Sequence, residues 1–179
     1  VFRWFPTETI PFETKVSRNT GGWLARYADF KEVSFQSEAG VRVRAQLLSP
    51  QQRRSEAPLL IYVKRQDDSF HFADVDELLP LFGRRTVLIL NPRFTEQPMN
   101  AAEFANVERT AVWSGRTLAA MQVWDILRAV RWAMDEEKLP ASSISLYGKG
   151  EMGIVALYAA LFDDRGKQVI LNDPPTSHG

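Results

Sequence analysis

The stretch that decides the fold is Ser143-Ile144-Ser145-Leu146-Tyr147-Gly148-Lys149-Gly150-Glu151-Met152-Gly153. The β-prone residues at its start give way to three glycines, and an apolar run at helical spacing follows in residues 154–162. This pattern predicts a buried strand that turns sharply into a helix. Because the amide N–H groups and the dipole of a helix favour negative charge at its N-terminus, we expect a functional site at this turn.

The composition excludes several classes of function. The chain has 179 residues, enough for one domain with a buried core, and its 22 basic residues balance its 22 acidic ones. With a net charge of zero we predict that it binds neither nucleic acid nor an anionic membrane surface. Without cysteine there is no disulfide, thiol nucleophile or thiolate metal site, and we predict neither a metal nor a cofactor.

Membrane insertion is not expected either, because no apolar stretch reaches the roughly 18 residues that span a bilayer. The first residues do not have the pattern of a signal peptide. Since the sequence does not begin with Met, a removed signal stays open, and so does the compartment, inside or outside the cytoplasm.

We divide the chain into an N-terminal aromatic arm, residues 1–29, and one α/β domain, residues 30–179. The arm is rich in aromatic residues and in Pro and Gly, without a sustained period, so we expect its aromatic side chains to anchor it across the body of the domain.

Periodicity predicts the order of the elements in the domain. The expected elements are a hairpin over residues 31–47, a strand over 58–63, a helix over 72–82, a strand over 86–90, a helix over 114–137, a strand ending at 147, a helix over 152–162 and a strand over 168–171. The strands 58–63 and 86–90 are continuously apolar and should pair in parallel. Residues 91–109 are expected to form a long polar loop, and loops of this length are often functional.

The glycines of the turn match the dinucleotide-binding pattern, with Gly148, Gly150 and Gly153 spaced as G-x-G-x-x-G and with Asp173 twenty residues beyond the third glycine. An oxidoreductase domain that binds NAD or FAD is therefore one hypothesis. That pattern normally opens the first βαβ unit of its domain, whereas here four strands precede it. Bulky charged residues also occupy the turn, so we favour another interpretation.

The alternative is a nucleophile elbow, because the order of elements is that of the first six strands of an α/β hydrolase, with the turn after the fifth. Residues 122–132 (QVWDILRAVRW), 147–153 (YGKGEMG) and 156–163 (ALYAALFD) resemble the acetyl xylan esterase-like branch of these hydrolases, over about residues 30 to 175. The resemblance implies an α/β-hydrolase-like, mostly parallel sheet with an N-terminal antiparallel hairpin and helices on both faces, incomplete after its sixth strand. It also implies hydrolysis of carboxylic esters, on acylated carbohydrate or small esters.

One departure from this family changes the expected chemistry. Aligned on the family motif G-x-S-x-G-G, Gly150 stands where the nucleophilic serine belongs. His71 lies on the oxyanion side of the fold, and His178, one residue from the end, is a weak candidate for the base. We therefore expect a pseudoenzyme, a binding or structural domain, or part of a longer protein. An esterase with a nonstandard nucleophile is the further alternative, and ester hydrolysis that survives substitution of Ser145 and Ser177 would support it.

The anion-binding part of the elbow is expected to remain. The resemblance assigns one oxyanion donor to the N–H of Glu151 and the other to the loop that begins Lys64-Arg65. A surface ion pair of these cations with Asp67 and Asp68 is the alternative. Asp173 is a weak candidate for a carboxylate at the site.

A sheet that stops after six strands leaves an open edge of unpaired N–H and C=O groups. We therefore expect the missing C-terminal half, a second chain or a symmetric homo-oligomer to complete it.

Overall fold

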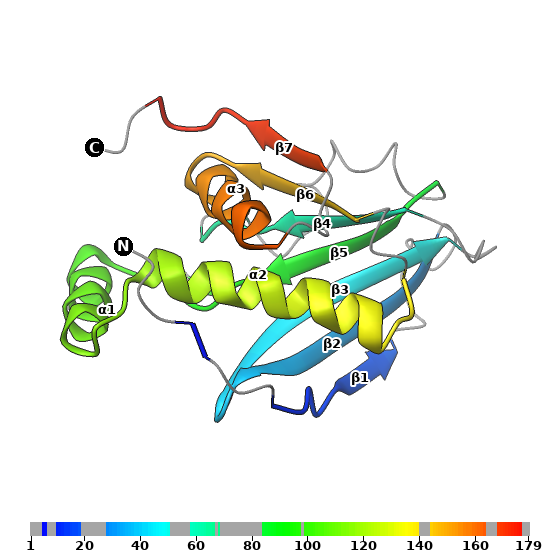
Figure 1. The fold of residues 1–179 in the computed structure, drawn as a ribbon, viewed down its shortest axis with the longest axis horizontal. Coiled ribbons are helices and arrows are strands. Elements are labelled where there is room, and N and C mark those ends of the chain that lie inside the picture. The colour runs from blue at the N-terminus through cyan, green and yellow to red at the C-terminus, as the bar shows by residue number, and fades with distance from the viewer. Residues whose placement is uncertain are drawn as a thin grey trace.

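A computed structural model of the chain describes residues 5–6, 10–18, 28–50, 58–66, 68, 84–97, 99–139, 144–163 and 168–176. Its strands are β1 (Lys15–Arg18), β2 (Ala28–Glu38), β3 (Val41–Pro50), β4 (Leu59–Val63), β5 (Thr86–Asn91), β6 (Ile144–Lys149) and β7 (Gln168–Asn172). Its helices are α1 (Ala101–Trp113), α2 (Leu118–Asp135) and α3 (Glu151–Phe162), as Figure 1 shows. The helix expected over residues 72–82 lies outside the described residues.

The strands form one sheet in the order β1-β2-β3-β5-β4-β6-β7. The pairs β1–β2, β2–β3 and β3–β5 are antiparallel, whereas β5, β4, β6 and β7 are parallel to one another. The expected hairpin and the parallel pairing of β4 with β5 are thus confirmed. Because the four parallel strands point the same way, their carboxyl ends share one edge of the sheet, where α3 begins (Figure 1).

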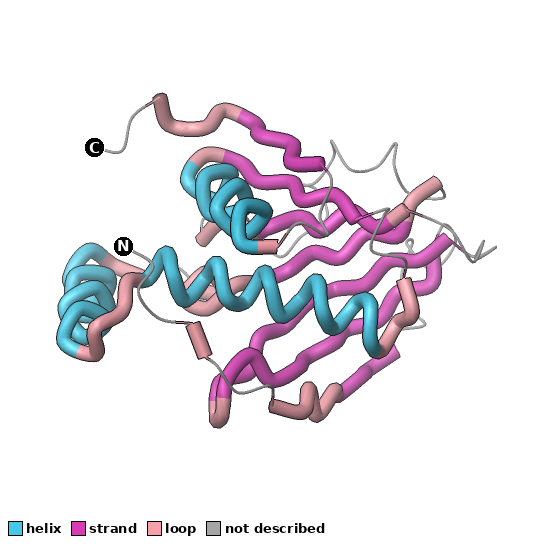
Figure 2. The backbone as a smooth tube through the Cα atoms, viewed as in Figure 1, coloured by secondary structure: helices cyan, strands magenta, loops and turns pink. Residues whose placement is uncertain are grey.

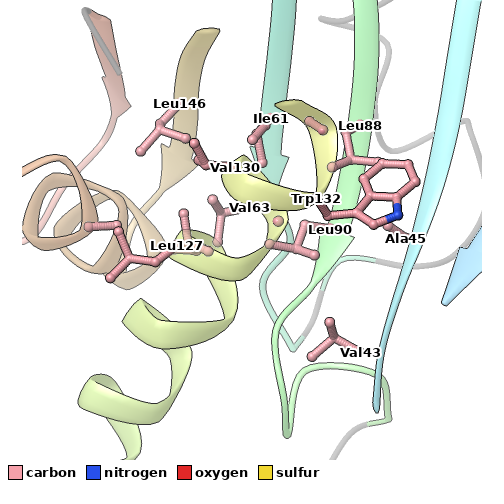
Figure 3. Packing of buried hydrophobic residues seen from close by; sticks show 14 of the residues in the cluster. Val43, Ala45, Ile61, Val63, Leu88, Leu90, Leu127, Val130, Trp132 and Leu146 are labelled. Carbon is pink, nitrogen blue, oxygen red and sulfur yellow. The ribbon is translucent and has the colours of Figure 1, made fainter. Parts of the chain in front are cut away.

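The core lies between the sheet and the two helices α2 and α3, which cover the same face (Figure 2). Alternate residues of β4 and β5 point into it, and Figure 3 shows Ile61, Val63, Leu88 and Leu90 beside side chains of α2. The residues between them, such as Leu60 and Val87, form a second cluster on the opposite face, as the period of two requires. Burial on both faces explains why these strands are continuously apolar.

Three elements differ from the sequence prediction. The expected loop over residues 91–109 is wrong in part, because α1 occupies its second half. A capping box starts this helix: the Asn100 side chain accepts from the Glu103 N–H, and the Glu103 carboxylate accepts from the Asn100 N–H. The next helix begins only at Leu118, after Gly115 adopts a φ of 72°. Residues 15–18 belong to the expected arm, for which the sequence predicts no regular structure, but they form β1 on the edge of β2.

Two aromatic residues of the N-terminal segment pack on the core. The Phe5 ring stacks 5.8 Å from Trp124, and the Phe12 ring meets Phe35 edge-on at 6.1 Å. The buried Arg128 donates to the Ile10 carbonyl at 2.9 Å. The division of the chain at residue 29 stays a prediction.

Among the described residues, no helix is long and apolar enough to cross a bilayer.

Candidate functional site

A cavity of about 500 Å³ lies at the shared carboxyl edge of the parallel strands. It is lined by residues that follow β4 (Arg65, Gln66) and β5 (Phe94, Thr95), that surround the start of α1 (Met99, Phe104), that belong to α2 (Leu118, Gln122) and that open α3 (Gly150, Glu151, Met152). In open α/β sheets this edge is where ligands bind. The cavity includes the turn that the sequence singled out.

The turn has a backbone conformation that glycine suits. Gly150 has φ 51° and ψ −129°, where an L side chain is strained, and its N–H donates to the Asn172 carbonyl at 2.9 Å. The N-cap residue Gly150 has no side chain, so it gives the first amide groups of α3 no side-chain acceptor.

The other two glycines allow α3 to pack close to β6. A Cβ atom on Gly148 would lie 2.4 Å from the Met152 carbonyl oxygen, and one on Gly153 would lie 3.1 Å from the Gly148 carbonyl oxygen. Close packing therefore accounts for Gly148 and Gly153, and the positive φ of the turn favours a glycine at position 150. Their G-x-G-x-x-G spacing needs no dinucleotide to explain it, and NAD or FAD binding stays an untested alternative.

Arg65 lies close to Gly150. Its Nη1 atom is 3.6 Å from the point where a Cβ on Gly150 would stand. Asp68 holds this arginine: Oδ2 accepts from the Arg65 backbone N–H at 2.9 Å, and Oδ1 accepts from Nε at 3.2 Å. The Tyr62 hydroxyl donates to the same Asp68 carboxylate at 3.0 Å. Arg65 is thus both a member of an ion pair and a cation at the cavity.

The remaining predicted site residues have different positions. Lys64 is buried, with its N–H donating to the Leu90 carbonyl, and it is not among the described residues that line the cavity. Glu151 lines the cavity from the first turn of α3. Asp173 follows β7 with φ 48° and is exposed outside the lining. His71, His178, Ser177 and Asp67 lie outside the described residues.

Hydroxyl groups offer no evident nucleophile in the described part of the cavity. Thr95 carries the only hydroxyl among the described lining residues, and it donates to the Pro92 carbonyl at 2.8 Å. Ser145 is buried in β6 and its hydroxyl donates to Gln168 at 3.3 Å.

Sequence reasoning placed the segment after β5, residues 92–95, in a loop of a kind that is often functional, but it named no site residue there. Arg93 in this segment joins a buried network in which its guanidinium contacts Asp125 and Glu38, at 2.6 and 2.7 Å. Glu38 also binds Arg116, and the Ser37 hydroxyl donates to Asp125. Only the Asn91-Pro92 turn signal and the length of the expected loop marked this segment, because the partners are distant in sequence.

Electrostatics stabilises the charged forms in this network. Burial on its own raises the pKa of Glu38, but hydrogen bonds and charge from Arg116 and Arg93 outweigh burial and hold the pKa below its ordinary value. Burial on its own lowers the pKa of Arg93, but Asp125 and Glu38 raise it above the ordinary arginine value. Both groups are therefore charged at neutral pH.

Solved structures show a fold similar to that of this chain, whereas the two sequence comparisons found no match. No protein-family model matches the chain, and no curated protein matches it in sequence. Among solved structures it is similar to an acetyl xylan esterase from Paenibacillus sp. R4, with a TM-score of 0.71 and 17% identity over 89% of this chain and 53% of that one. Acetyl xylan esterase 1 from Thermoanaerobacterium sp. JW/SL YS485 gives 0.69 and 16%, over 89% and 52%.

A glucuronoyl esterase from Solibacter usitatus matches with a TM-score of 0.66 and 13% identity, over 93% of this chain and 53% of that one. The chain therefore has the α/β-hydrolase fold, and acetyl xylan esterases are among its structural neighbours, as the sequence resemblance predicted. It spans about half the length of these neighbours.

Proposed function

We propose that this esterase-like protein binds an acylated carbohydrate, or a small carboxylic ester, at the cavity beside Gly150, and that it does not hydrolyse the ester by a Ser-His-Asp triad. The observation that supports the proposal best is the elbow backbone at Gly150 below the Arg65 guanidinium. The structural neighbours named above as carbohydrate esterases support the class of ligand.

The binding chemistry follows from two sources of positive potential at the cavity. The first amides of α3 point out of the helix N-terminus, and the guanidinium of Arg65 adds a permanent charge. Both interact favourably with an ester carbonyl oxygen, and more strongly with the carboxylate that ester cleavage releases. We expect ligands to orient their acyl group toward Gly150.

Gly150 is also the reason why we expect no hydrolysis by a Ser-His-Asp triad. Gly150 has no side chain to attack a carbonyl, and removal of a triad serine costs on the order of a million-fold in turnover. Such a site retains ligand binding and the stabilisation that its hydrogen-bond donors give to an oxyanion.

The test is a titration with acetate and with an acetylated xylobiose, followed through the amide NMR signals of Gly150 and Glu151. We expect both probes to shift these signals, and Arg65→Ala to raise the dissociation constants by about tenfold, the loss of a charge-assisted hydrogen bond. Arg44→Ala is the matched control, since Arg44 is an exposed arginine of β3 paired with Glu96 and lies outside the cavity lining.

Two results would overturn this proposal. One is unchanged binding by Arg65→Ala, and the other is turnover of nitrophenyl acetate at enzymatic rates by pure protein. If that turnover survives Ser145→Ala and Ser177→Ala, the nonstandard nucleophile is a different residue.

We also propose that the working protein covers the β7 edge and the outer side of α3, by further sequence, by a second chain or by a symmetric homo-oligomer. Large apolar side chains are exposed there, namely Leu157, Leu161, Phe162 and Leu171, with Leu161 at 72%. Such a patch on a sheet edge favours association. A monodisperse monomer of these 179 residues alone in sedimentation, with no binding of a hydrophobic dye, would exclude it.

A further inference from the structure

Phe94 has a backbone conformation that a bulky residue rarely adopts. Its φ is 66°, and its side chain is 40% exposed although it is a large aromatic group. A left-handed conformation costs a non-glycine residue of order 1–3 kcal/mol and persists only where the surroundings enforce it. Strained residues of this kind are common at ligand-binding positions, so we infer that the Phe94 side chain has a functional role.

The residues on either side of Phe94 enforce the conformation. The backbone N–H and the Nε of Arg93 both donate to Asp125 Oδ2 at 2.9 Å, and Asp125 is fully buried on α2. On the other side, the N–H and hydroxyl of Thr95 both donate to the Pro92 carbonyl, at 3.1 and 2.8 Å. Phe94 is thus presented at the surface by a buried and closely bonded turn.

Phe94 lines two neighbouring cavities. One is the cavity beside Gly150, and the other, of about 300 Å³, lies between α1 and α2. The second cavity has an apolar floor that includes Val107, Ala111 and Met121, and its polar residues are uncharged: Asn106, Thr110 and Ser114. Together the two volumes fall within the range of small-molecule sites.

We propose that Phe94 is a stacking platform for the sugar ring next to the acylated one, and that the ligand is an acylated oligosaccharide that spans both cavities. This inference rests on the proposed function, because it takes the acyl group to lie beside Gly150. A pyranose ring has an apolar C–H face, which suits an aromatic ring, and a rim of hydroxyl groups, which suits uncharged hydroxyl and amide side chains. The next sugar of the chain then occupies the α1–α2 cavity.

The experiment compares two probes by calorimetric titration: an acetylated methyl xyloside with one sugar, and an acetylated xylotetraose. We expect the wild-type protein to bind the tetramer at least tenfold more tightly. Phe94→Ala and Phe94→Gly should abolish this preference while they change the affinity for the single sugar by less than twofold. Phe94→Trp, which keeps an aromatic platform, should retain the preference.

Trp113→Ala is the matched control. Trp113 is an aromatic residue on α1 that is 89% exposed and outside both cavity linings, so its loss should leave the preference unchanged. Phe94→Gly also controls for folding, because glycine tolerates the backbone conformation that Phe94 adopts.

The outcomes separate this inference from the proposed function. Equal wild-type affinities for the two probes, or a length preference that Phe94→Gly retains, would overturn the platform and leave ester binding at Gly150 intact. A preference that depends on Phe94 but not on Arg65 would support the platform and overturn the elbow site. Failure of both probes and of acetate to bind would overturn both.

Discussion

The Arg93 guanidinium donates hydrogen bonds to both carboxylate oxygens of Asp125, with Nη2 2.6 Å from Oδ1 and Nε 2.9 Å from Oδ2. Asp125 is fully buried in the middle of α2, and Arg93 follows β5. The pair therefore fixes the segment that lines the cavity to the helix that covers the sheet. Such a pair does not by itself raise stability, but breaking it leaves a buried charge.

Asp125→Ala should lower the free energy of unfolding by about 3–5 kcal/mol, because Arg93 loses its main counter-ion in a buried setting. Urea denaturation measures the change. The control is Arg44→Ala, which breaks the exposed pair of Arg44 with Glu96 and should cost about 0–1 kcal/mol. Equal effects of the two substitutions would contradict the importance of the buried pair.

Acid should weaken the fold through Glu38. Burial on its own raises the pKa of this carboxyl, yet Arg116 and Arg93 bring it below the unfolded value of about 4.3. Its contribution to stability is therefore fully present above that unfolded pKa and is lost as the pH falls through the folded pKa.

Glu38→Gln should accordingly reduce the slope of unfolding free energy against pH below about pH 4.3, which is the unfolded glutamate value. Denaturation at a series of pH values from neutral to acidic measures this slope for both proteins. An unchanged slope would show that other carboxylates dominate acid unfolding.

The glycines of the elbow should differ in their tolerance of alanine. Gly148→Ala places a Cβ 2.4 Å from a backbone oxygen, so it should cost about 3 kcal/mol or more. Among the described residues, Gly150→Ala meets only Arg65 at ordinary contact distance, so strain alone should cost about 1–2 kcal/mol. Gly40→Ala in the hairpin is the control, with φ 75° and no atom of the described part of the chain within 4 Å. Thermal unfolding should rank Gly148→Ala well below the other two.

Phe94→Gly should be more stable than Phe94→Ala by about 1 kcal/mol, although both lose the ring. The difference isolates the backbone strain, because only glycine adopts a φ of 66° without penalty. Chemical denaturation of the two variants gives the value. If the alanine variant were as stable, Phe94 would not be strained.

Short-range patterns were sufficient for much of the architecture. The hairpin of β2 and β3, the buried strands β4 and β5 and the elbow before α3 all follow from periodicity and glycine spacing within a few residues. The start of α1 was within reach as well, since Asn100 and Glu103 form a capping box. Its weak apolar face, with only Ala111 buried, explains why periodicity missed it.

Long-range contacts explain what sequence reasoning could not find at the site. Arg93 and Asp125 are 32 residues apart, and Ser37 and Asp125 are 88 apart. Nothing in the local sequence pairs them, because their meeting depends on β5 lying between β3 and β4 in the sheet. Arg65 above Gly150 also requires β4 and β6 to be neighbours, and only the family resemblance, not a local pattern, indicated this loop in advance.

The sequence by itself therefore determined the sharp turn from β6 to α3, with Gly150 at its centre, and the class of fold, since these depend on residues close together in the chain. Only the tertiary structure decided which side chains surround that glycine. It brought Arg65 over the turn and held Phe94 in a strained conformation between two cavities, because strand order and buried ion pairs place distant segments side by side.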